Sequence, residues 1–143
     1  MPLPQRIRWA IIGLTLSLGS AVGQADVVAV VSAQSAITTL SKTQVADIFL
    51  GKTSRFPDGQ PALPLDQAET SPLREEFYLK FTGKSPAQIR AHWSKIIFTG
   101  RGQPPPVVLN SVQMKKRIAA SPAAIGYIEQ NMVDGSVKVL AQP

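Results

Sequence analysis

The stretch Val27-Val28-Ala29-Val30-Val31 decides the fold, because it is an unbroken run of apolar and mostly β-branched residues. A strand with one face in water alternates polar and apolar residues, whereas a continuous run is typical of a strand buried on both faces, as in an α/β sheet. We therefore expect the first element of the folded domain to be a central strand.

Four helices are predicted downstream, each from a polar cap followed by apolar residues at helical spacing. Ser41-Lys42-Thr43-Gln44 and Ser85-Pro86-Ala87-Gln88 both have the form of a capping box. Ser71-Pro72 places a capping hydroxyl before a proline that suits the first turn. The predicted helices are residues 42–50, the segment from Pro72 to Gly83, the segment from Pro86 to Ile97, and residues 111–120. We expect the second and third to form an antiparallel pair.

Short strands are predicted at residues 62–65, 125–128 and 137–140, the last two on either side of an Asp134-Gly135 turn. Residues 66–70 read as a loop, and the glycines and prolines of residues 99–106 indicate an exposed basic loop. Strands that alternate with helices predict a three-layer α/β domain, a mixed sheet with flanking helices.

Residues 1–25 have the form of a secretory signal peptide. Arg6 and Arg8 precede an uncharged apolar run, and small residues lead to a cleavage site after Ala25. We therefore expect a signal peptide over residues 1–25, a single periplasmic domain over residues 26–143 and no stable membrane insertion after cleavage. The alternative is that the segment is retained as an N-terminal anchor helix.

Composition excludes several kinds of site. The 143 residues include no Cys and a single His, His92, which excludes disulfides, thiol catalysis, and Cys-rich or His-rich metal sites within one chain. No nucleotide-binding or hydrolase motif occurs, so we predict no catalytic residues, metal or cofactor. The net charge of +6 suits an anionic partner, and export argues against nucleic acid.

The best candidate for a ligand site is the segment from Asp66 to Arg74. It brings hydroxyl groups, backbone N–H groups and a guanidinium to the start of one helix, which is the chemistry of an anion site. The candidate oxyanion ligands are Gln67, Thr70, Ser71 and Arg74. The alternative is that Arg74 only pairs with a neighbouring acid, namely Asp66, Glu69 or Glu75.

Other basic residues have simpler interpretations. Lys52 and Arg55 follow a predicted helix end, where cations complement the helix dipole, and Lys115-Lys116-Arg117 suit a solvated helix face. Arg101 lies on the Gly/Pro loop, where it either covers a ligand, contacts a partner or is only solvated.

Two segments carry a family resemblance. The stretch from Leu40 to Lys52 and the stretch Pro122-Ala123-Ala124-Ile125-Gly126-Tyr127-Ile128 resemble motifs of the type II periplasmic substrate-binding proteins of phosphate ABC transporters. The resemblance implies the fold of one lobe of such a protein, with Ser71 and Arg74 in its oxyanion-binding loop. The family's Ser-Gly-Thr stretch is replaced here by Glu69-Thr70-Ser71-Pro72, and the domain has room for only one of the usual two lobes.

Two functions follow from this interpretation. The first is an exported non-enzymatic module that binds phosphate or a similar oxyanion in transport or sensing. The alternative is a periplasmic interaction module that has the lobe fold but no small ligand and that docks another envelope protein or a second copy of itself as a homodimer.

Overall fold

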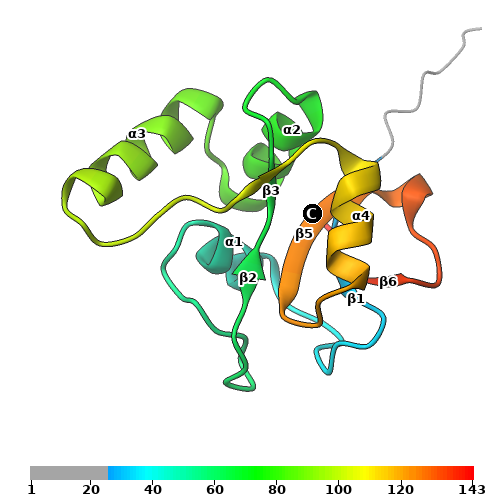
Figure 1. Cartoon of the computed structure of the whole chain (residues 1–143). Helices are drawn as coiled ribbons and strands as arrows, with labels where there is room; N and C mark the ends of the chain where they lie inside the picture. The colour runs from blue at the N-terminus through cyan, green and yellow to red at the C-terminus, as the bar shows by residue number, and fades with distance from the viewer. Residues whose placement is uncertain (1–25) are drawn as a thin grey trace, which may run out of the picture.

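The computed structural model describes residues 26–143, so the predicted signal peptide lies outside the described residues. Figure 1 shows the chain, and its elements follow one another in this order: β1 (Val27–Ser32), α1 (Lys42–Phe49), β2 (Leu63–Pro64), β3 (Asp66–Gln67), α2 (Pro72–Thr82), α3 (Pro86–Phe98), β4 (Val107–Val108), α4 (Ser111–Ala119), β5 (Ala124–Glu129), a 3-10 turn (Gln130–Met132) and β6 (Val137–Ala141). Within this part of the chain no helix has the length and hydrophobicity that a membrane span requires.

The main sheet has four strands in the order β2-β5-β1-β6. The interior position of β1 confirms the prediction from its sequence, and all six of its residues are buried. β1 runs antiparallel to both β5 and β6, whereas β2 runs parallel to β5, so the sheet is mixed as expected.

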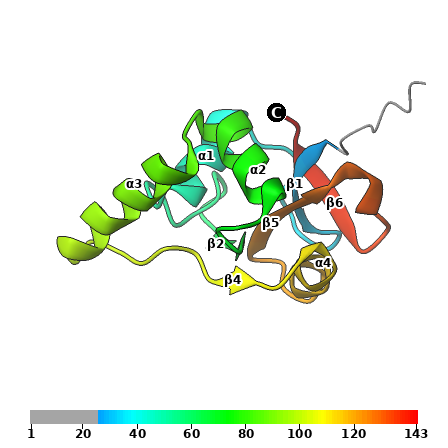
Figure 2. The same ribbon diagram turned by 90° about the horizontal axis from the view of Figure 1, so that it is seen from above.

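Alternate residues of β1 pack against helices on opposite faces of the sheet, so the domain has three layers. Val27, Ala29 and Val31 belong to a core cluster with α1, α2 and α3, while Val28 and Val30 belong to a second cluster with α4. Figure 2 shows α1 and α2 on one side of the sheet and α4 on the other. The predicted α/β architecture of a mixed sheet between helices is confirmed.

The predicted helix starts are confirmed by their caps. In α1 the Ser41 Oγ accepts from the Gln44 backbone at 3.1 Å, and the Gln44 side chain accepts from the Ser41 N–H at 2.9 Å. Ser85 and Gln88 make the same reciprocal pair before α3. Gly83 ends α2 in the left-handed conformation, with φ of 71°.

One prediction about strands needs correction. Residues 66–70 are not entirely a loop, because Asp66 and Gln67 form β3 and pair in parallel with Val107 and Val108 of β4. Such a two-residue strand has no periodicity from which to predict it. The strands at either side of the Asp134-Gly135 turn are present, but β1 lies between them and pairs with each, so they do not pair with one another.

The expected antiparallel pair of α2 and α3 is also wrong. Only the start of α3 lies beside α2, and the helix then runs outward from the body of the molecule, as Figures 1 and 2 show. Ile89 and Trp93 anchor its first half in the core, whereas Phe98 at its end is 92% exposed. The apolar residues of α3 thus cover the core for only part of the helix length.

Candidate functional site

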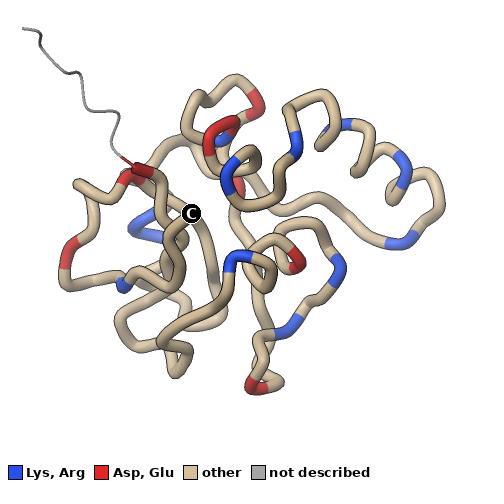
Figure 3. Tube along the Cα trace, turned by 180° about the vertical axis from the view of Figure 1, so that it is seen from behind, with Lys and Arg blue, Asp and Glu red and all other residues tan. Residues whose placement is uncertain are grey.

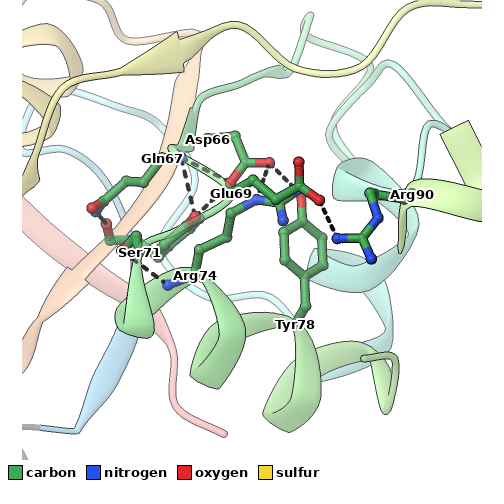
Figure 4. A network of polar contacts seen from close by, with 8 residues as sticks. Asp66, Gln67, Glu69, Ser71, Arg74, Tyr78 and Arg90 are labelled. Atoms are coloured by element: carbon green, nitrogen blue, oxygen red, sulfur yellow. Dashed lines mark hydrogen bonds and ion pairs between the residues drawn. The ribbon is translucent and has the colours of Figure 1, made fainter. Parts of the chain in front are cut away.

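The candidate site lies where β3 leads into α2 (Figure 4). Asp66 and Gln67 are held in β3 by pairing with β4, and the Asp66 N–H donates to the Pro106 carbonyl at 2.8 Å. Ser71 is the N-cap of α2, and its Oγ accepts from the backbone N–H of Arg74 at 3.4 Å. The strand pairing and the helix cap together fix the segment that carries the predicted ligands.

Asp66 is the centre of a buried polar network and is only 3% exposed. Its carboxylate accepts from the Tyr78 hydroxyl at 2.8 Å and from Arg74 Nε at 3.2 Å. It also accepts from the Tyr127 hydroxyl and, at 2.8 Å, from the Gln67 backbone N–H. Four donors from three parts of the chain therefore satisfy one buried acid, as a buried carboxylate requires.

Arg74 pairs with Asp66, which is one of the acids that the sequence offered as its partner. The pair occupies one edge of the guanidinium. The pair uses Nε, and the guanidinium carbon lies 4.8 Å from the centre of the Tyr78 ring. Within residues 26–143 Arg74 forms an ion pair with no acid other than Asp66, and its side chain keeps 11% of its surface exposed. The guanidinium is thus oriented through one edge, and no second acid neutralises it.

Arg74 and the two tyrosine hydroxyls of this network keep their protonation states near neutral pH. Burial acts to lower the pKa of Arg74, but the Asp66 carboxylate raises it, and it lies above its ordinary value. Burial and then Asp66 raise the pKa of the Tyr78 and Tyr127 hydroxyls well above their ordinary range. Both tyrosines therefore remain hydrogen-bond donors to the acid.

The remaining predicted ligands take different positions. The Gln67 side chain is buried and donates to the Ser111 Oγ at 3.2 Å and to the Tyr127 carbonyl at 3.3 Å, which ties β3 to α4 and β5. Thr70 is exposed, just before the Ser71 cap. The structure thus brings Thr70, Ser71 and Arg74 to the start of α2 and places Gln67 behind them.

Sequence reasoning missed three residues of this region. Tyr78 follows Arg74 by four positions on α2, a spacing that puts two side chains on one helix face and was available as a signal. Arg90 reaches from α3 to pair with Glu69, and it lowers the pKa of that acid. Tyr127 lies on β5, 61 positions from Asp66, and no local pattern could have joined them.

Within residues 26–143 no three His, Cys, Asp or Glu side chains are grouped in a way that could hold a metal ion. The polar atoms of the site are hydroxyl, guanidinium and backbone N–H donors around one satisfied carboxylate. Donors of this kind bind oxyanions.

Comparison with known proteins gives matches in structure alone. No family model and no curated protein matches the sequence. A structure described as a phosphate ABC transporter substrate-binding protein of Clostridium perfringens, with bound phosphate, matches with a TM-score of 0.63 at 20% identity, over 80% of this chain and 44% of that one. The chain has part of the fold of such a protein.

Two further structures agree with this assignment. An ABC-type phosphate transport receptor from Vibrio cholerae matches with a TM-score of 0.63 at 21% identity, over 82% of this chain and 48% of that one. PstS from Borrelia burgdorferi matches with a TM-score of 0.55 at 16% identity, over 81% and 46%. The chain therefore spans less than half the length of each protein, consistent with a single lobe, and at these identities the likeness shows the fold alone.

Proposed function

We propose that this chain is an exported, non-enzymatic binding module that takes phosphate or a similar oxyanion at the start of α2, in a transport or sensing role. The observation that carries the proposal is the guanidinium of Arg74, which Asp66 holds through Nε and which forms no ion pair with a second acid within residues 26–143. The fold agrees, since its structural neighbours are named for phosphate transport or solved with phosphate.

In the proposed complex, the two terminal nitrogens of Arg74 donate to two oxygens of the anion, a bidentate geometry that only a guanidinium offers. The Ser71 and Thr70 hydroxyls stand at the same helix start and supply further donors. The positive end of the α2 dipole adds to the attraction. Because Tyr78 and Asp66 already orient Arg74, little side-chain entropy remains to be lost on binding.

The acids of the site decide the charge of the preferred anion. Asp66 pairs with Arg74, and Glu69 pairs with Arg90, so the four side chains together carry no net charge. The site then offers directed donors rather than excess positive charge. This balance favours a singly charged oxyanion, such as dihydrogen phosphate, over a fully ionised one.

Thermal unfolding in phosphate, sulfate and chloride at matched ionic strength tests the proposal. Phosphate at about a hundred times its dissociation constant stabilises a protein by roughly 2.7 kcal/mol, which is readily measured as a rise in Tm. Arg74→Lys keeps a cation for Asp66 but removes the two terminal N–H donors of the guanidinium. We therefore expect the phosphate-specific rise in Tm to disappear. Arg90→Lys, at an exposed arginine, is the matched control and should keep it. An equal rise in phosphate and chloride would contradict the proposal.

The interaction module is kept as a second candidate because of one apolar surface. Val107, Leu109 and Val112, around β4 and the start of α4, are 62%, 80% and 48% exposed. Val107 belongs to β4, and Leu109 directly follows that strand. Light scattering with and without phosphate separates the candidates: a dimer or complex indifferent to phosphate favours docking, whereas a phosphate-responsive monomer favours the oxyanion module.

A further inference from the structure

A second hollow lies away from Arg74, between α3 and the Gly/Pro loop that follows it. It has a volume of about 430 Å³ and lies among the end of α1, β2, the second half of α3 and residues 101–106. None of Gln67, Thr70, Ser71 or Arg74 lines it. Figure 2 shows the loop running back from the far end of α3 toward β4. The volume falls within the range of small-molecule sites.

The walls of this hollow are mostly apolar and include one fixed aromatic ring. Ile48, Pro64 and Ile96 contribute aliphatic surface, and Trp93 contributes its indole. The ring is held closely, because even a methyl group at Gly51 would come within 2.9 Å of it. Trp93 is 7% exposed, and its Nε1 has no hydrogen-bond partner within residues 26–143. The hollow is thus lined in part by a closely held indole ring.

The residues that line the hollow carry a single charge, which is positive. Arg101 is the charged residue among those that line it, and within residues 26–143 its guanidinium has no acid within ion-pair distance. Between Glu76 and Glu129 the sequence contains neither Asp nor Glu. Figure 3 shows the basic residues along α3 and the loop. An anion in the hollow would meet one unpaired cation and no acid among the residues that line it.

We propose that this hollow binds a small organic anion with a flat apolar body, of the class of aromatic carboxylates. The apolar part would lie against Trp93 and Ile96, and the carboxylate would pair with Arg101 at the rim, where the guanidinium can donate two parallel hydrogen bonds. Inorganic phosphate, with no apolar surface, would gain nothing from these walls. The site is therefore chemically distinct from the one proposed at Arg74 and does not depend on it.

The test uses nuclear magnetic resonance of the ¹⁵N-labelled full chain carrying Trp9→Phe, which leaves Trp93 as the one remaining tryptophan. The probes are naphthalene-2-carboxylate and its neutral analogue, naphthalene-2-carboxamide. We expect the carboxylate to shift the Trp93 indole N–H signal saturably at millimolar concentration and to bind more tightly than the carboxamide. An unmoved indole signal with both probes would overturn the proposal.

Two variants assign the carboxylate to Arg101. Arg101→Gln should weaken binding of the carboxylate about three- to fivefold, the size expected for a partly exposed ion pair, and leave the carboxamide unaffected. Arg117→Gln, on an exposed arginine of α4, should change neither. Arg74→Lys should also leave both probes unaffected, which separates this site from the oxyanion site. Equal affinity for both probes, unchanged in Arg101→Gln, would overturn the assignment.

Discussion

Arg74 and Arg101 show two opposite ways in which this chain places a guanidinium. Arg74 is largely buried, pairs with Asp66 and lies over the Tyr78 ring, so only its outer edge is free. Arg101 lies on an exposed loop and, within residues 26–143, has no acid to pair with. Buried partners fix the position of the first guanidinium, whereas within residues 26–143 no acid pairs with the second.

Because the two guanidinium groups are placed differently, we expect different effects on folding stability and on ligand binding when each is removed. A group that closes a buried network contributes to both, because its removal leaves partners without hydrogen bonds. A group on a solvated loop contributes little to folding, so its charge remains available to a ligand. Variants in the two regions test whether the buried group contributes more to stability than the solvated one.

The largest effect is expected at the centre of the buried network. Asp66→Ala leaves the Arg74 guanidinium and two tyrosine hydroxyls without their shared acceptor. Loss of one partner of a buried ion pair costs about 3–5 kcal/mol. Urea unfolding should therefore show a free energy of unfolding lower by about that amount.

Glu69→Ala is the matched control, because Glu69 also pairs with an arginine but both partners are about half exposed. Exposed pairs contribute about 0–1 kcal/mol, so this variant should unfold close to the parent midpoint. Similar losses for Asp66→Ala and Glu69→Ala would show that the buried network does not stabilise the fold as the structure indicates.

The next effect is a loss of stability in alkaline solution. Tyr78 and Tyr127 have raised pKa values in the folded state, whereas in the unfolded chain a tyrosine ionises near pH 10. Their contribution is therefore complete below about pH 10 and is lost as the pH rises toward the folded values, by roughly 1.4 kcal/mol per pH unit for each tyrosine. Urea unfolding at several pH values above 10 measures this slope. Tyr127→Phe should reduce it, and an unchanged slope would contradict the assignment.

The parts of the fold predicted correctly are those with a local physical signal. The apolar run of β1 and the capping boxes at Ser41 and Ser85 concern residues close in sequence, and each was confirmed. The pairing of β3 with β4 depends instead on backbone groups about 40 positions apart, and two polar residues carry no strand signal. The outward course of α3 depends on how much core remains for it to cover, which no helical pattern encodes.

The candidate site likewise has some features with a local sequence signal and others that depend on the packed fold. The hydroxyls and guanidinium at the start of α2 could be identified because caps and helix starts are local features. That Gln67 turns toward α4, and that Tyr127 reaches Asp66 from β5, follow from the packed sheet. The sequence thus indicated which donors lie at the helix start and named Asp66 among three possible partners of Arg74, but it could not tell which of the three acids would pair with it.

The smallest effect is expected at Arg101. Because its guanidinium has no ion pair within residues 26–143, Arg101→Ala should change the free energy of unfolding by no more than about 0.5 kcal/mol. Arg74→Ala, measured alongside, should cost several times more, because it leaves the buried Asp66 carboxylate without its cation. Urea unfolding of both variants provides the measurement. A large loss for Arg101→Ala would mean that the loop is held by its arginine, and the hollow beside Trp93 would then be a structural contact rather than a site open to a ligand.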